Sequence, residues 1–135
     1  MKKTRLLLSA LLVLATVTSL RGAPVISEFL ADNVTGIKDE DGDEEDWIEI
    51  HNPDPAPVNL AGWSLTDDDE LEQRWTFPSV TLAPGQRLLV FASGKNRSDP
   101  AANLHTNFSL KAPGEYLALL NPSGNPASEF PPAFP

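Results

Sequence analysis

The chain has 135 residues, of which 19 are acidic and 10 are basic, so its formal net charge at pH 7 is −9, and it contains no cysteine. The acidic balance argues against nucleic-acid binding, which depends on Lys and Arg that neutralise phosphates, and favours solubility, a bound cation or a basic partner. The absence of cysteine excludes disulfides and thiol catalysis, and this length suffices for one domain held together by its core alone.

Residues 1–22 have the pattern of a secretion signal. Three basic residues within the first five precede an apolar run over 6–17, which is shorter than the about 20 apolar residues of a membrane span. We therefore predict an export signal that is cleaved after Gly22, because Pro24 disfavours a cut after Ala23; an uncleaved anchor is the alternative. Removing residues 1–22 takes away four basic residues and no acid, which leaves six basic against 19 acidic residues, a net charge of −13 and no membrane span. The expected location is secreted, periplasmic or cell-surface.

The rest of the chain is predicted to consist of short β-strands separated by turns, with no helix. Side chains alternate between the two faces of a strand, and this pattern predicts strands over 25–31 and 46–52. In the second of these, Trp47, Glu49 and His51 share one face, while Ile48 and Ile50 share the other. The further predicted strands are 58–65 (bent at Ala61-Gly62), 74–77, 80–82, 86–93, 107–110 and 115–121.

Proline and glycine mark the turns between these strands, and the chain contains 13 prolines, a residue excluded from helix interiors and central strands. Residues 67–73, the one candidate for a helical turn, are predicted to be a loop, and 94–102 a long polar loop. The Pro-rich end, 125–135, is either an edge strand or the start of a linker. The pattern as a whole predicts an all-β antiparallel sandwich or barrel.

An acidic loop that precedes the second predicted strand is the strongest candidate site. Its Asp39, Asp41, Asp43 and Asp46 offer the hard oxygen ligands that Ca²⁺ prefers. The spacing differs from that of an EF-hand, because Gly42 is the fourth residue from Asp39 and not the sixth. A second acidic cluster, 67–70, would join the first if both loops lay at one end of the domain. The two interpretations of this loop are a Ca²⁺ site and a charged loop that faces solvent, and most acidic runs of this kind face solvent.

The other candidate residues point to structural roles. His51 and His105 are the only histidines, and no nucleophile motif surrounds Ser64 or Ser109, so we expect ordinary hydrogen bonds from both imidazoles and no zinc or hydrolase site. Nothing selects a glycosidase-like pair among the acidic residues. Trp47, Trp63 and Trp75 are expected in the core; an aromatic platform for sugars is the alternative.

Several segments, taken in order, resemble the lamin-tail domain family in the form found in exported bacterial proteins. They are Ile26-Ser27-Glu28-Phe29-Leu30-Ala31-Asp32-Asn33, the stretch from Asp41-Gly42 through Asp46-Trp47-Ile48-Glu49-Ile50-His51-Asn52, Val58-Asn59-Leu60-Ala61-Gly62-Trp63-Ser64-Leu65-Thr66-Asp67, Trp75-Thr76-Phe77-Pro78, the stretch from Leu82-Ala83-Pro84-Gly85 to Asn96, and the stretch from Leu104 to Asn121. No single segment is specific, but the ordered set covers nearly all of residues 24–124.

The resemblance implies an immunoglobulin-like β-sandwich over 24–124 and a non-enzymatic module. In lamins the domain is a docking surface for proteins and, in some accounts, DNA; the basic surface that DNA docking requires is missing here. The resemblance also implies that such domains accompany hydrolase or spore-coat-type kinase domains in larger exported proteins.

The sequence thus predicts an exported, non-catalytic module that docks to a protein or glycan, with no catalytic residue and no obligate cofactor. One alternative is an accessory or spacer domain of a larger exported enzyme, of which this chain would be a truncated product; an in-frame continuation into a catalytic domain would favour it. Another is a Ca²⁺-dependent adhesion module.

Overall fold

The computed structural model describes residues 22–111 and 115–131, which form short β-strands and no helix. Within these ranges no segment is a helix long and apolar enough to cross a membrane; the predicted signal, 1–22, lies outside them except for its last residue. The strands are β1 (Val25–Leu30), β2 (Trp47–His51), β3 (Val58–Asn59), β4 (Ser64–Thr66), β5 (Trp75–Thr76), β6 (Thr81–Leu82), β7 (Arg87–Phe91), β8 (Leu104–His105), β9 (Leu117–Leu120) and β10 (Pro126–Phe130).

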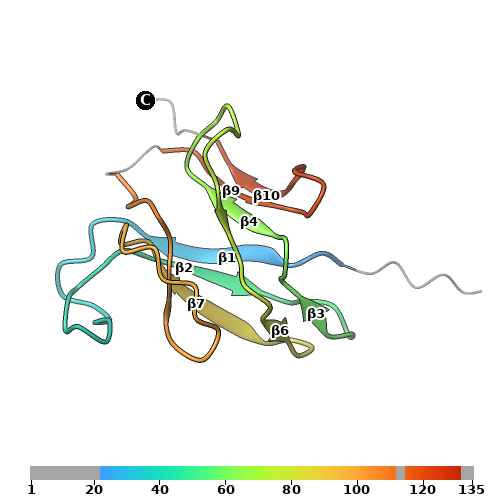
Figure 1. The fold of residues 1–135 in the computed structure, drawn as a ribbon, viewed down its shortest axis with the longest axis horizontal. Coiled ribbons are helices and arrows are strands. Elements are labelled where there is room, and N and C mark those ends of the chain that lie inside the picture. Colours follow the sequence, from blue (N-terminus) through green and yellow to red (C-terminus); the bar gives the residue numbers. More distant parts are fainter. Residues whose placement is uncertain (1–21, 112–114, 132–135) are drawn as a thin grey trace, which may run out of the picture.

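Two four-stranded sheets face each other as an immunoglobulin-like β-sandwich (Figure 1). The first sheet has the order β1-β2-β7-β8 and the second the order β10-β9-β4-β5, while β3 and β6 form a small two-stranded sheet beside them. All pairings are antiparallel except that of β7 with β8, which is parallel. The predicted all-β sandwich is therefore confirmed.

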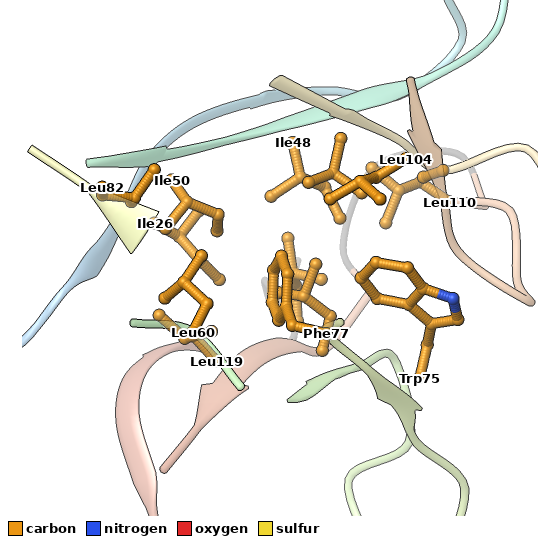
Figure 2. Packing of buried hydrophobic residues seen from close by; sticks show 14 residues of the cluster. Ile26, Ile48, Ile50, Leu60, Trp75, Phe77, Leu82, Leu104, Leu110 and Leu119 are labelled. Atoms are coloured by element: carbon orange, nitrogen blue, oxygen red, sulfur yellow. The ribbon is translucent and has the colours of Figure 1, made fainter. Parts of the chain in front are cut away.

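The core lies between the two sheets and is built by the alternation of side chains along the strands (Figure 2). Ile48 and Ile50 of β2 point inward and are fully buried, and they belong to the same buried cluster as Leu65 and Leu119 of the second sheet. β-branched and aliphatic side chains suit such a pleated, buried surface, and each fully buried side chain of this size stabilises the fold by about 1.5–3 kcal/mol. Trp75 and Phe77 complete the core, with their rings 4.9 Å apart in an edge-to-face arrangement.

The tryptophan prediction is correct for two of three residues. Trp75 is buried in the core and Trp63 packs against it partly buried. Trp47 instead lies on the outer face of the first sheet, because Ile48 and Ile50 occupy the inner face of the same strand. Alternation along the strand predicts that Trp47 lies on the face opposite to that of Ile48 and Ile50. It does not predict which of the two faces packs against the second sheet.

Two strand predictions require correction. The predicted strand 58–65 is divided into β3 and β4, which belong to different sheets. The chain turns at Gly62, whose φ of +82° lies in the left-handed region that glycine adopts at little cost. In β8, Leu104 and His105 form the strand that was expected at 107–110.

The displaced strand has a local cause. The Thr106 hydroxyl donates to the carbonyl of Phe108 over 2.6 Å, which turns the chain at the point where the strand was expected. Residue Ser109 retains only an isolated bridge to Ser93. At the other end of the chain, β10 is an edge strand that pairs with β9.

Candidate functional site

The acidic loop is organised by the carboxylate of Asp39. Its Oδ1 accepts hydrogen bonds from the backbone N–H groups of Asp41, at 2.9 Å, and Asp43, at 3.0 Å. The backbone N–H of Asp39 donates to the Asp43 carbonyl over 2.9 Å. Gly42 permits this tight turn, because its φ is +85°. The side chain of Asp39 is fully buried as a result.

Asn33 ties the preceding segment to the base of this loop. Its amide Nδ2 donates to the carbonyls of Ile37, at 2.9 Å, and Glu45, at 3.0 Å, and its Oδ1 accepts from the N–H of Gly36 at 2.8 Å. The backbone N–H of Asn33 donates to Asp46 Oδ1 over 3.1 Å. Asp46 therefore fastens the loop to the end of β1 and does not point toward the other three aspartates.

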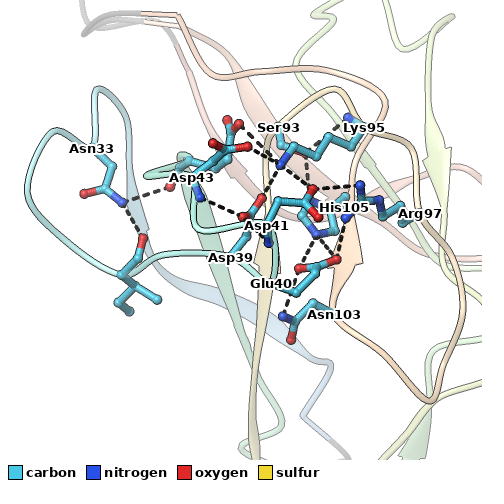
Figure 3. Close-up of polar contacts among 12 residues, drawn as sticks. Asn33, Asp39, Glu40, Asp41, Asp43, Ser93, Lys95, Arg97, Asn103 and His105 are labelled. Atoms are coloured by element: carbon cyan, nitrogen blue, oxygen red, sulfur yellow. Dashed lines mark hydrogen bonds and ion pairs between the residues drawn. The ribbon is translucent and has the colours of Figure 1, made fainter.

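The ammonium of Lys95 lies where Asp39, Asp41 and Asp43 converge (Figure 3). Lys95 Nζ pairs with Asp39 Oδ2 and lies 2.9 Å from Asp41 Oδ2 and 2.8 Å from Asp43 Oδ2. It belongs to the polar segment that follows β7. The cation that balances the acidic loop in this structure is thus supplied by the chain itself.

A second layer of the same cluster is centred on Glu40. Arg97 donates to Glu40 Oε1 over 2.6 Å and to Asp41 Oδ2 over 2.8 Å. Glu40 also accepts from Asn103 Nδ2 at 3.0 Å and contacts Nε2 of His105 at 3.0 Å. These contacts fix the acidic loop against the segment 95–105, across more than 50 residues of sequence.

His105 forms a bridge in the middle of this cluster. Its ring stacks on Phe91 with centroids 5.2 Å apart, and its Nδ1 lies 2.8 Å from Ser93 Oγ. A carboxylate on Nε2 favours the tautomer that carries its proton there, which leaves Nδ1 to accept from the Ser93 hydroxyl. Serine, histidine and glutamate also form hydrolase triads, but the His105 side chain is fully buried and Glu40 is held by Arg97 and Asn103. The arrangement favours a structural bridge.

The pKa values of the carboxylates in the cluster are lowered and that of the lysine is raised, so both kinds of group stay charged over a wider pH range. Burial by itself would raise the pKa of Asp39, but hydrogen bonds from Lys95 and from two backbone N–H groups outweigh it and hold the pKa below 3.8. Asn103, the loop backbone and His105 lower the pKa of Glu40 far below its ordinary value. Arg97 and then Lys95 lower the pKa of Asp41. Asp39, Asp43 and Asp41 raise the pKa of Lys95 in return.

Of the four predicted metal ligands, the structure brings Asp39, Asp41 and Asp43 together and holds Asp46 elsewhere. Asp39, Glu40 and His105 form a second group with metal-ligand spacing. Sequence reasoning missed Lys95 and Arg97, although they are the only basic residues between 88 and 110.

The second acidic cluster, 67–70, does not join the first. It lines a separate polar hollow with Lys111 and Glu115. Asp68 there accepts backbone N–H groups of Glu70, at 3.1 Å, and of Glu72 and Gln73, both at 3.0 Å. These bonds lower the pKa of Asp68 and shape the segment as a loop, as predicted.

The Ca²⁺ site stays a prediction. A variant of Lys95 can test it, because the Lys95 ammonium occupies the position that Ca²⁺ would take. Calcium would have to displace an ammonium that three carboxylates already hold. We therefore expect CaCl₂, compared with EDTA, to raise the melting temperature of a Lys95→Gln variant more than that of the wild type, since a ligand specific for the folded state stabilises it. A melting temperature that CaCl₂ leaves unchanged in both proteins would argue against a Ca²⁺ site, and an equal rise in both would place the bound Ca²⁺ away from Lys95.

Acid should weaken the cluster in a defined pH window. The pKa values of Asp39, Glu40 and Asp41 are lowered by folding from ordinary values of 3.8, 4.5 and 3.8. Their contribution to stability is therefore complete above these values and is lost as the pH falls through the lower folded-state pKa values. We expect the melting temperature to fall steeply below about pH 4.5, and less steeply in a Lys95→Met variant.

The matched control for this pH series is Lys38→Met. Lys38 is largely exposed and makes one long ion pair, 3.8 Å, to Glu44. Removing it should leave the slope of melting temperature against pH nearly unchanged, because exposed ion pairs contribute little. A Lys95→Met protein with the wild-type slope would contradict the role assigned to Lys95.

Comparison with known proteins gives one family. The model of the Lamin Tail Domain family matches residues 18–131, which is most of the chain. No curated protein matches the sequence.

Proposed function

The chain belongs to the lamin tail domain family, and from this premise we propose that it is an exported module that binds a protein partner and catalyses no reaction. The family consists in general of non-catalytic immunoglobulin-like domains. Support for export comes from the signal-like pattern of residues 1–22. N-terminal sequencing of the exported protein tests that part of the proposal.

The position of the exposed apolar side chains carries the docking proposal. Five large hydrophobic residues are exposed in the described chain, and all of them lie on β1, on the loop after it, or against it. They are Phe29, Leu30, Val34, Ile37 and Phe130, which we call the β1 patch. Phe130 reaches it from β10, with its ring 5.1 Å from that of Phe29. Exposed apolar side chains concentrated at one edge are typical of a protein-binding surface.

Charge indicates the kind of partner. Five of the six basic residues in the described chain form ion pairs with carboxylates of the same chain, namely Lys38, Arg87, Lys95, Arg97 and Lys111. The remaining carboxylates leave the surface acidic. A protein segment that carries both apolar and basic side chains complements the β1 patch and its surroundings.

The experiment measures binding of the labelled protein to intact cells of the producing organism, before and after protease treatment of those cells. We expect protease-sensitive binding that falls about tenfold in an Ile37→Asp variant, since buried apolar contacts dominate interface energies. Thr81→Asp, at the exposed position of strand β6, is the matched control and should bind like the wild type. Binding that survives protease would identify a polysaccharide, and equal binding of the Ile37→Asp protein would move the interface elsewhere.

A further inference from the structure

A small cavity lies where the described chain begins. It has a volume of about 220 Å³, and its lining includes Gly22, Ala23 and Pro24 together with Asp54 and Trp63. The first three residues precede β1, and Asp54 belongs to the loop after β2. The predicted cleavage site, between Gly22 and Ala23, and the carboxylate of Asp54 therefore line the same cavity.

Asp54 is buried, with 6% of its surface exposed, and only one of its two carboxylate oxygens is satisfied. Oδ1 accepts from the backbone N–H of Ala56 at 2.8 Å. Oδ2 is shielded from solvent and has no hydrogen-bond partner among the described residues. A buried carboxylate oxygen without a partner is costly, which makes a positively charged donor the favourable neighbour.

The sheet register brings residues 22–24 next to the segment that carries this carboxylate. β1 and β2 are antiparallel with Val25 opposite His51, so the residues just before β1 run alongside the residues just after β2. In agreement, a Cβ atom built on Gly22 would lie 3.7 Å from Cγ of Pro53. Ala23 and Pro53–Asp54 thus lie on neighbouring chain segments.

We propose that signal cleavage between Gly22 and Ala23 creates the partner of Asp54. A signal peptidase adds water across this peptide bond: the carboxylate remains on Gly22 and leaves with the signal, and the new amine of Ala23 takes up a proton. The resulting α-ammonium forms a charge-assisted hydrogen bond with Asp54 Oδ2. In the precursor the same nitrogen is an uncharged amide, so cleavage adds stability to the mature fold. This inference rests on the proposed export.

The test compares the mature chain, beginning at Ala23, with the same chain acetylated at its α-amine. Acetic anhydride near pH 6.5, added to the chain while it is unfolded in guanidinium chloride, modifies this amine selectively, because its ordinary pKa is about 7.7–8.0 and that of lysine is about 10.4. We expect acetylation to reduce the unfolding midpoint in urea and to shift the folding equilibrium roughly tenfold toward the unfolded state. In an Asp54→Asn background, which keeps the acceptor for Ala56, acetylation should have less than about a twofold effect.

Asp99→Asn is the matched control, because Asp99 Oδ1 accepts the N–H of Ala101 at 2.9 Å in an equivalent but exposed loop. Acetylation should destabilise this variant as much as the wild type. An equal effect of acetylation on the wild type and on Asp54→Asn, or no effect on either, overturns the pairing while leaving export intact. An exported protein that begins at a residue other than Ala23 overturns the pairing, and one that retains residues 1–22 overturns cleavage as well.

Discussion

Replacing Asp39 by alanine is expected to lower the free energy of unfolding by about 3 kcal/mol, because it breaks a buried ion pair and two hydrogen bonds at once. The carboxylate is fully buried, binds the ammonium of Lys95 and accepts the backbone N–H groups of Asp41 and Asp43. Alanine leaves these N–H groups without their acceptor. Urea denaturation monitored by tryptophan fluorescence measures the change.

Asp43→Ala is the control for this prediction. Asp43 contacts the same ammonium at 2.8 Å, but its side chain is 58% exposed. Its loss should lower the free energy of unfolding by less than about 1 kcal/mol, as for other exposed pairs. If both variants lost the same stability, charge balance alone would explain the cluster, and the buried turn around Asp39 would have no special role.

The sandwich could be predicted because its signals are local. Alternation in Trp47–His51 and the Pro-Gly turns depend only on neighbouring residues, and the structure has strands at nearly all of the predicted positions. The failures depend on distant contacts. The outward placement of Trp47 follows from packing of the two sheets, and the division of residues 58–65 follows from pairing of β3 with β6 and of β4 with β9.

The candidate site illustrates the same limit. The sequence showed the carboxylates of the acidic loop, and three of the four predicted ligands do converge. It did not show Lys95, which lies more than 50 residues away and reaches the loop only because β2 pairs with β7. Nor did the sequence reveal that Asp46 is used to hold the N–H of Asn33.

Asn52→Ala is expected to lower the free energy of unfolding by about 3 kcal/mol, because Asn52 is a fully buried polar side chain that joins three segments. Its Nδ2 lies within hydrogen-bond distance of three carbonyls, those of Ala56, at 3.0 Å, and of Leu82 and Ala83, both at 3.2 Å, so its two hydrogens are shared among them. Its Oδ1 accepts the N–H of Asp54 at 3.1 Å. Alanine removes all four contacts and leaves buried polar groups of the backbone without partners.

An Asn52→Asp variant separates the donor role of this side chain from its acceptor role. Aspartate has nearly the same shape and still accepts the N–H of Asp54, but an ionised carboxylate cannot donate to the three carbonyls and would face them as a buried negative charge. We therefore expect Asn52→Asp to be at least as destabilising as Asn52→Ala in urea denaturation at pH 7. Asn59→Ala is the control for Asn52→Ala, because Asn59 is an exposed asparagine whose Oδ1 also accepts the backbone N–H of the residue two positions later. A well-folded, stable Asn52→Asp protein would show that the acceptor contact alone holds the loop, and that the three carbonyls do not need the amide.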